Sequence, residues 1–374
     1  MSECPISGHV APGFEPVGEA FAVNFAEDQE LGAGFCAILN GETVVDLHGG
    51  WADKRKTTLW DASTIVPVYS ATKGISALVL ARVIDQLPAG YKTLVAEVWP
   101  EFAAAGKEAV TIAEMVSHQA GLSGFAEEID PALWLDPPAC AAALAAQKPI
   151  WPPGSAHGYH PLSWGYLIGE LVQRIAGRSL GTILREDIAG PAGIDFQIGT
   201  PDTDLARIGE MMRPRALPEL GEINAATRAA FLTKWASAKR GDAAWRTIEI
   251  PSANGHGGAS GVAALYGIYA NGGRLGSAQI VPEASFEALI TPRTIGQDLV
   301  LPFVVEFTSG LMRNNLGFFG PNPNTLCHAG WGGSMGLGDP DEGLSAAYVM
   351  NRQSNSLIGD PRARRLADAL YACL

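Results

Sequence analysis

Ser70 and Lys73 are the pair of residues in this 374-residue chain with the clearest chemical potential. Apolar residues at helical spacing follow them, at positions 75, 78, 79, 83 and 84, so a helix is expected to begin at Ser70. Lys73 would then lie one turn later on the same face, where its amine can meet the Ser70 hydroxyl. The helix N-terminus would favour an anion on Ser70 and lower the pKa of the amine, which suits acyl transfer. A lone Ser-x-x-Lys is more often a capping serine with an exposed lysine, so other motifs must decide.

Tyr159 is the second candidate, because it ends a rigid turn that contains Pro152, Pro153 and Gly154. It lies just before an apolar helical pattern at residues 162–176. A phenol beside a lysine can share its proton or act as the base, since a nearby cation lowers the pKa of the phenol. A tyrosine in such a turn is, taken alone, more often a packing residue or the donor of a loop hydrogen bond.

Residues 327–336 are mostly small and form a third motif, with His328, Gly330 and Trp331 at its start. Small residues let a strand edge approach a ligand closely. Such an edge can offer a backbone N–H as the second donor of an oxyanion hole, with Ser70 supplying the first, and His328 would face the pocket. The stretch also contains Ser334 in a G-x-S-x-G pattern, but no histidine follows His328 to serve as its base. A glycine-rich turn beside the pocket is the better interpretation of Ser334.

The elements that must hold these residues come from both ends of the chain. A helix is expected at residues 16–29, and Asn40-Gly41 between two apolar runs predicts a hairpin of residues 34–39 and 42–47. A strand at 343–350 and an amphipathic helix at 361–373 follow near the other end. Residues 74–190 show mostly helical spacing, with one helix over 162–176 that stops at Gly177 and another that Ser179 caps. The pattern of residues 214–251 does not place them.

Composition excludes several classes of protein. The chain is 47% apolar and 17% charged, with a mean hydropathy of +0.10, so it can bury a core. Its net charge of −13, with no basic run longer than residues 54–56, argues against a nucleic-acid partner. Five scattered cysteines form no C-x-x-C pair, and the histidines show no metal-ligand spacing, so neither a disulfide framework nor a metal is expected. Without a visible leader, a long apolar span or a nucleotide-binding loop, we expect a cytoplasmic protein with no cofactor and no membrane partner.

The three motifs, in this order and spacing, resemble the serine β-lactamase-related superfamily, in the branch that is similar to class C β-lactamases and contains the family VIII carboxylesterases. Residues 68–74, 115–122 and 254–258 match in kind, and the similarity covers roughly residues 30 to 370. The resemblance implies a mixed α/β fold of the β-lactamase/DD-peptidase type, with a central antiparallel sheet flanked by helices. It also implies a discontinuous sheet domain of residues 1–85 and 252–374, a mostly helical inserted domain of residues 86–251, and an active site in the cleft between them.

A covalent acyl-enzyme is the mechanism that this resemblance implies. Ser70 would be the nucleophile, Lys73 and Tyr159 would transfer protons, and the N–H groups of Ser70 and Trp331 would form the oxyanion hole. The third motif is aligned at His328-Ala329-Gly330, because the turn that begins at Asp339 lies eleven positions after His328. Aligning Trp331-Gly332-Gly333 instead would make Ser334 the second donor. The residues that would line the substrate pocket are His160, His256, Trp134 and Trp235.

Two departures from the family pattern concern the substrate. Pro161 stands where a β-lactamase has an asparagine that holds the acylamino side chain of a lactam, and His328 replaces a lysine suited to a substrate carboxylate. Both changes weaken recognition of anionic β-lactams and leave ester hydrolysis intact. We therefore expect a serine carboxylesterase acting on small or short-acyl esters. The alternatives are a β-lactamase, D-alanyl peptidase or acyltransferase using the same site, and a catalytically inert binding or assembly module of the same fold.

Overall fold

The computed structural model describes residues 4–27, 29–214, 216–238 and 243–374. Parts of two sequence-based expectations lie outside these residues. The expectation of no leader in residues 1–20 includes residues 1–3, and the unplaced segment 214–251 includes residues 215 and 239–242. Within the described ranges, no helix has both the length and the apolar character needed to cross a membrane.

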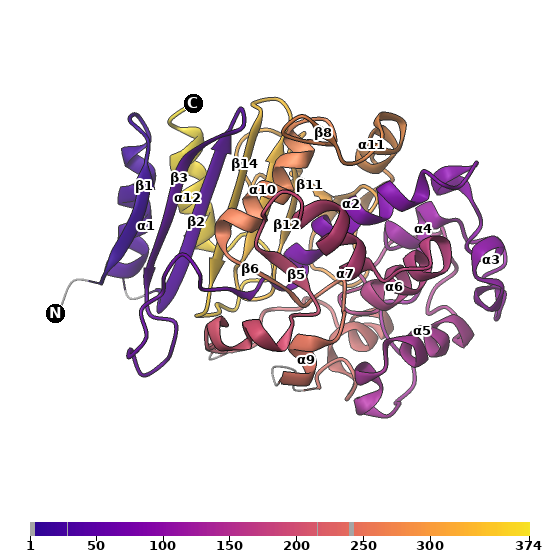
Figure 1. Ribbon diagram of the computed structural model, residues 1–374. Coiled ribbons are helices and arrows are strands. Elements are labelled where there is room, and N and C mark those ends of the chain that lie inside the picture. Colours follow the sequence, from indigo (N-terminus) through magenta and orange to yellow (C-terminus); the bar gives the residue numbers. More distant parts are fainter. Residues whose placement is uncertain (1–3, 28, 215, 239–242) are drawn as a thin grey trace.

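One large antiparallel sheet dominates the part of the molecule that contains both ends of the chain (Figure 1). Its N-terminal strands pair with its C-terminal strands through β2 and β14, in a register that sets Phe35 opposite Tyr348. The strand order is β1 (Ile6–Val10), β3 (Glu42–Gly50), β2 (Gly32–Leu39), β14 (Leu344–Met350), β13 (Met335–Asp339), β12 (Leu326–Ala329), β11 (Met312–Arg313), β10 (Val304–Phe307) and β9 (Thr294–Gln297). The expectation of a central antiparallel sheet built from both termini is confirmed.

The predicted hairpin is present as β2 and β3. Asn40 has a φ of 52° and Gly41 a φ of 84°, the left-handed conformations that a two-residue hairpin turn requires. The strands continue beyond the predicted residues to Gly32 and Gly50, with a register shift between Ala37 and Ile38.

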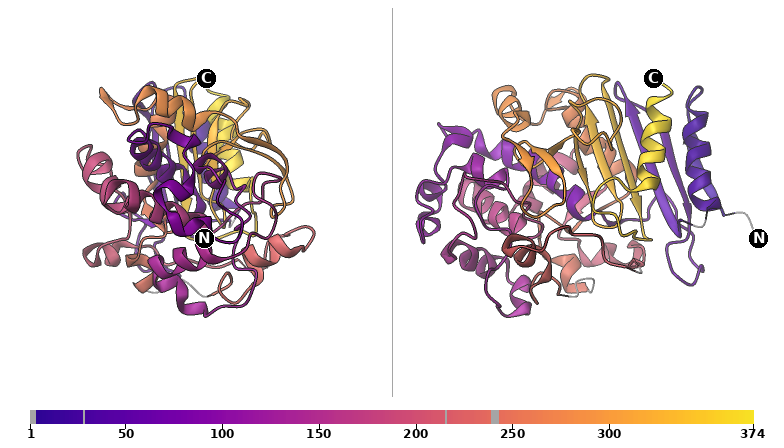
Figure 2. Two further views of the ribbon diagram at one scale, coloured as in Figure 1. Left: turned by 90° about the vertical axis from the view of Figure 1, so that its right-hand side faces the viewer. Right: turned by 180° about the vertical axis from the view of Figure 1, so that it is seen from behind.

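Helices cover both faces of the sheet (Figures 1 and 2). On one face, α1 (Glu15–Ala26) packs against α12 (Pro361–Tyr371). On the other, α10 (Ala259–Ala270) lies across β2, β13 and β14. This approach is close because β13 has glycine at position 336, where an added Cβ would lie 2.4 Å from the Tyr266 ring of α10.

The buried helix α2 (Thr72–Ile84) connects the sheet to a largely helical region, where it contacts α6, α7, α10 and α11. The remaining helices are α3 (Val95–Val98), α4 (Ile112–Val116), α5 (Pro137–Ala146), α6 (Ser163–Ala176), α7 (Leu180–Ile183), α8 (Ala225–Thr227), α9 (Ala243–Thr247) and α11 (Glu283–Ile290). Short 3-10 or π turns are η1 (Tyr69–Ala71), η2 (Gly90–Lys92), η3 (Pro100–Ala103), η4 (Pro131–Leu135), η5 (Leu184–Ala189), η6 (Asp202–Arg207) and η7 (Arg228–Leu232). Two small sheets contain β4 (Val66–Pro67), β6 (Gly255–Gly257) and β5 (Phe196–Ile198), and β7 (Arg274–Leu275) and β8 (Ala278–Gln279).

The two helix ends predicted from capping residues are confirmed. Gly177 follows α6 with a φ of 67°, a left-handed cap that glycine adopts without strain. The Ser179 side chain accepts a hydrogen bond from the Thr182 N–H at the start of α7. The domain boundaries at residues 85 and 252 stay a prediction.

Candidate active site

Ser70 lies in η1, the single helical turn that leads into α2. The preceding residue, Tyr69, has a left-handed φ of 48°, so the chain turns sharply just before Ser70. Two residues before the serine, the Val68 carbonyl accepts hydrogen bonds from the Ala71 N–H (3.2 Å) and the Ser334 hydroxyl (2.7 Å). This strained and anchored turn leaves the Ser70 side chain partly exposed, whereas most of α2 is buried.

Lys73 is fully buried, with its amine beside the Ser70 hydroxyl. The Nζ atom lies 3.3 Å from Ser70 Oγ, 2.8 Å from the Pro161 carbonyl and 3.0 Å from the Ser252 carbonyl. Three acceptors match the three N–H bonds of an ammonium, but burial lowers the pKa of Lys73 well below its usual 10.5. The amine therefore both points at the serine and releases its proton at a lower pH than an exposed lysine.

Tyr159 covers this amine. Lys73 Nζ lies 4.7 Å from the centre of the Tyr159 ring, and among the described residues no hydrogen-bond partner of normal geometry meets the buried phenol oxygen. Burial raises the pKa of Tyr159, while the adjacent Ser70 hydroxyl favours its ionised form. The ring packs against His118, with centroids 5.0 Å apart, and stacks on Phe307 at 6.3 Å. The serine, the lysine and the tyrosine that the motifs singled out are thus brought together.

Asp298 fixes the backbone beside Tyr159, and the sequence analysis missed it. Its Oδ1 atom accepts hydrogen bonds from the N–H groups of Tyr159 (3.0 Å), Val300 (2.8 Å) and Leu301 (2.8 Å). Burial raises the pKa of Asp298 to about 6, against these three donors. The carboxylate lies 139 positions from Tyr159 in the chain and in no recognisable motif, so no local signal could have found it.

His328 lies on β12 and reaches the same place from the sheet. Its ring centre is 5.9 Å from that of Tyr159, and its Nδ1 is 2.7 Å from the carbonyl of Ala329. Burial, helped by the charge of Lys73, lowers the pKa of His328 to about 3. The imidazole is therefore neutral at physiological pH and does not supply the positive charge that a lysine would.

The loop after β12 is packed onto the segment that precedes the serine. The Gly330 N–H donates to the Ser334 carbonyl (2.7 Å), and a Cβ at Gly330 would lie 2.2 Å from the carbonyl oxygen of Val68. Ser334 is 2% exposed and donates its own hydroxyl to the same Val68 carbonyl. Ser334 therefore ties the two segments together, consistent with a turn residue and not with a nucleophile.

A cavity of about 440 Å³ opens beside Ser70. Trp331 lines it together with the serine, as does Pro161, which stands where the family pattern has an asparagine. Most of the remaining wall is apolar and comes from residues 214–253: Leu217, Leu220, Phe231, Leu232, Trp245 and Ala253. A volume of this size is typical of a small-molecule site.

The two histidines predicted to line the pocket are fully buried and are not among the residues of its wall. His160 Nε2 accepts a hydrogen bond from the Leu122 N–H at 3.0 Å, and its Nδ1 is 2.5 Å from the Gly158 carbonyl. His256 Nδ1 is 2.8 Å from the Asn254 carbonyl. Because backbone groups occupy these ring nitrogens, both histidines hold loops in place, and the structure does not bring them to the cavity.

The predicted tryptophans are displaced in the same way. Trp134 and Trp235 are 6% and 0% exposed, and Trp235 packs edge-on against Phe125 within the helical region. The cavity wall contains Trp245 instead, with its ring 6.1 Å from that of Tyr69. The structure therefore brings Trp245 to the described cavity wall and does not bring Trp134 or Trp235 there.

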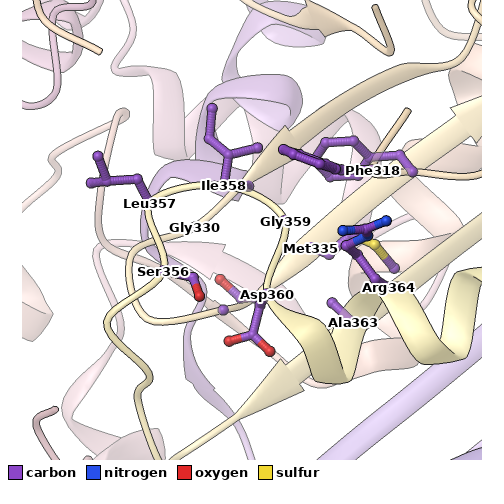
Figure 3. A pocket seen from close by; sticks show the side chains of 14 residues that line it. Phe318, Gly330, Met335, Ser356, Leu357, Ile358, Gly359, Asp360, Ala363 and Arg364 are labelled. Carbon is purple, nitrogen blue, oxygen red and sulfur yellow. The ribbon is translucent and has the colours of Figure 1, made fainter. Parts of the chain in front are cut away.

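A second, much smaller pocket of about 10 Å³ lies behind the loop after β12 (Figure 3). Gly330, Met335, Ser356, Asp360 and Arg364 are among the residues that line it. Its volume is close to the minimum for one water molecule, so it is too small for a substrate.

Comparison with known proteins gives consistent results. The sequence model of the Beta-lactamase family matches residues 19–371. An esterase/beta-lactamase, LipL of Mycobacterium tuberculosis, is 32% identical over 370 residues, which cover 94% of this chain and 84% of LipL. The crystal structure of a penicillin-binding protein homolog from Caulobacter crescentus has 48% identity and a TM-score of 0.96, over 99% of this chain and 100% of that one. The crystal structure of a family VIII carboxylesterase has 38% identity and a TM-score of 0.91, again over 99% and 100%.

Proposed function

Since this chain belongs to the Beta-lactamase family and is a serine hydrolase with the β-lactamase/DD-peptidase fold, we propose that it hydrolyses small, short-acyl carboxylic esters through an acyl-enzyme at Ser70. The observation that carries the proposal is the 3.3 Å contact between the Lys73 amine and the Ser70 hydroxyl at the edge of the cavity. The relatives described as esterase and carboxylesterase support ester substrates.

In the proposed reaction, Ser70 gives its proton to the Lys73 and Tyr159 pair as its oxygen attacks the ester carbonyl carbon. The two groups are coupled, so the proton belongs to the pair and not to one member. The N–H groups of Ser70 and Trp331 stabilise the oxyanion of the tetrahedral intermediate. As that intermediate collapses, the alcohol leaves with the proton and Ser70 carries the acyl group. Water, deprotonated by the same pair, then releases the acid and restores the serine.

Two features favour esters over β-lactams. The Pro161 carbonyl accepts a hydrogen bond from Lys73, and proline offers no side-chain amide for an acylamino group. His328 is neutral, since burial lowers its pKa to about 3, and so provides no charge for the carboxylate of a lactam. A β-lactamase, D-alanyl peptidase or acyltransferase would use the same nucleophile and differ in the leaving group or the acceptor.

We place the site in a cleft between a sheet domain of residues 1–85 and 252–374 and a helical domain of residues 86–251. Ser70, Lys73 and His328 belong to the first, and Tyr159 to the second. Most of the cavity wall also belongs to the second, so a shift between the two domains would change the cavity without moving the serine and the lysine apart.

The test is the hydrolysis of p-nitrophenyl butyrate and nitrocefin by the protein and by its Ser70→Ala variant. Ester turnover that requires Ser70, with slow nitrocefin turnover, is the expected result. Comparable cleavage of nitrocefin would favour a β-lactamase. If a fluorophosphonate labels no serine and neither substrate reacts, the chain is an inert binding module. Peptide mass spectrometry should find the label on Ser70 and still find it there in Ser334→Ala.

A further inference from the structure

Arg213 and Gln353 are polar residues in the mostly apolar wall of the cavity beside Ser70, and both act on the hydroxyl of a third lining residue, Tyr69. Arg213 is the one charged side chain among the described residues that line the cavity. The protein as a whole is strongly acidic, with a net charge of −13, so a cation at this position is a local exception. Its location on the wall of the cavity that Ser70 also lines suggests a role in binding.

The backbone at Arg213 is held against the segment that supports Trp331. The Met212 N–H donates to the Asn351 carbonyl at 2.6 Å, and the Gln353 N–H donates back to the Met212 carbonyl at 2.9 Å. The Gln353 side-chain amide donates to the Trp331 carbonyl at 3.3 Å. Arg213 is thus fixed at its base relative to the loop that approaches the serine, while its side chain is exposed at the cavity.

The guanidinium of Arg213 forms no ion pair with a carboxylate of the described residues, unlike Arg178, Arg207 and Arg362, which each have acidic partners. The positive charge of Arg213 acts on Tyr69, another residue of the cavity wall. Burial raises the pKa of Tyr69 to about 12, and Arg213 opposes this rise, as does the half-buried Arg246. None of the described residues that line the cavity is acidic, so no lining side chain neutralises the positive charge of Arg213.

We propose that Arg213 binds a carboxylate of the substrate, so that the preferred esters carry an apolar body that fills the cavity and an acidic group at its end, as in the half-esters of dicarboxylic acids. This inference rests on the proposed function and specifies its substrate class. Guanidinium groups bind carboxylates through two parallel hydrogen bonds, which gives them both strength and orientation.

The kinetic test compares two p-nitrophenyl esters whose acyl groups have the same number of non-hydrogen atoms along the chain, one ending in a carboxylate (the adipate half-ester) and one in a methyl group (the heptanoate). The selectivity is the ratio of their kcat/KM values. We expect Arg213→Met to lower this ratio about tenfold or more, since hydrogen bonds to charged groups contribute about 1.5–3 kcal/mol. Arg213→Lys should lose less. The matched control, Arg274→Met in the distant strand β7, should leave the ratio where it is.

A binding measurement separates this inference from the proposed function. In the Ser70→Ala background, titration calorimetry should show that monomethyl adipate binds more tightly than methyl heptanoate, that salt weakens the difference, and that Arg213→Met removes it. Carboxylate-dependent binding by a protein that hydrolyses neither p-nitrophenyl ester would refute the proposed function and support the anion site. Equal binding of the two compounds, or an unchanged ratio of kcat/KM in Arg213→Met, would overturn the inference.

Discussion

Replacing Arg362 with methionine should both destabilise the fold and disturb the loop beside Ser70. Arg362 is 3% exposed at the start of α12. Its Nη1 donates to Glu30 Oε2 at 3.0 Å, and its Nη2 donates to Asp360 Oδ2 at 2.9 Å and to the Gly332 carbonyl at 3.1 Å. Tyr348 donates to the other oxygen of Glu30. One guanidinium therefore joins a buried carboxylate to the turn that contains Trp331.

The expected magnitude follows from burial. Removing one partner of a buried ion pair leaves the other charge uncompensated, which typically costs 3–5 kcal/mol, so the free energy of unfolding of Arg362→Met should fall by about that amount. The control is Arg365→Met in the same helix, where Arg365 pairs with Glu27 at the surface and donates to Asn24 Oδ1 at 2.6 Å. A partly exposed pair contributes about 0–1 kcal/mol and one hydrogen bond about 0.5–1.5 kcal/mol, so this variant should lose less stability than Arg362→Met.

The stability that Arg362→Met loses should depend on pH, because Glu30 titrates in the folded protein. Burial raises the pKa of Glu30 from 4.5 to about 7, although the charge of Arg362 opposes the rise. A carboxyl whose pKa is higher in the folded state binds protons more tightly there, so stability falls as pH rises from 4.5 through about 7. Without Arg362 the folded pKa of Glu30 rises further. The loss in Arg362→Met should therefore be larger at pH 8 than at pH 6.

The assay is equilibrium unfolding in urea, followed by tryptophan fluorescence at both pH values. Adding Glu30→Gln to Arg362→Met should recover part of the loss at pH 8, because no buried charge then remains unpaired on Glu30. Ester kinetics should show a lower kcat for Arg362→Met, since the Gly332 carbonyl has lost a donor. An equal loss at pH 6 and pH 8, with no recovery in the double variant, would refute the assignment of the effect to the Glu30 charge.

Three further outcomes are expected. Because burial lowers the pKa of Lys73, kcat/KM for p-nitrophenyl butyrate should rise with pH and level off well below pH 10.5. A rise centred near pH 10.5 would contradict the role of the buried amine. Gly333→Ala should lower the free energy of unfolding by about 1–3 kcal/mol and reduce kcat, because Gly333 has a φ of 123° and a Cβ there would lie 2.4 Å from Asp360 Oδ2. Gly272→Ala, at a φ of 62° with open space around it, is the control for the unfolding measurement in urea. Trp245→Ala should enlarge the cavity and so raise the kcat/KM of p-nitrophenyl octanoate relative to that of the butyrate. If the ratio of the two kcat/KM values stays the same, the acyl chain binds elsewhere.

Local signals in the sequence predicted local structure well. The Asn40-Gly41 pair located the hairpin because only left-handed residues close so tight a turn, and Gly177 ended α6 for the same steric reason. The pair of Ser70 and Lys73 was predicted to meet because a helical turn brings positions three apart together, and the two side chains do lie 3.3 Å apart.

The cavity could not be predicted in the same way. Its wall comes largely from residues 214–253, where η7 is a π turn and α8 and α9 are only 3 and 5 residues long, so no regular period marks the buried face. Two loop histidines, at positions 160 and 256, were expected to line the pocket. The Nδ1 atom of each ring instead faces the backbone carbonyl two positions earlier, and His160 Nε2 accepts from the N–H of Leu122, a contact 38 positions away that sequence spacing does not reveal.

The pairing of β2 with β14 has a consequence for how the chain is made. Residues 32–39 leave the ribosome about 300 residues before their partners at 344–350, and until then the β2 edge that β14 will cover has no hydrogen-bond partner. An apolar strand with an open edge is a template for aggregation, and pairings of such long sequence separation form slowly. The hairpin with β3 forms locally and protects only the other edge. The nascent protein therefore spends most of its synthesis with half of its sheet unfinished, and a chain cut before residue 344 would keep that edge exposed.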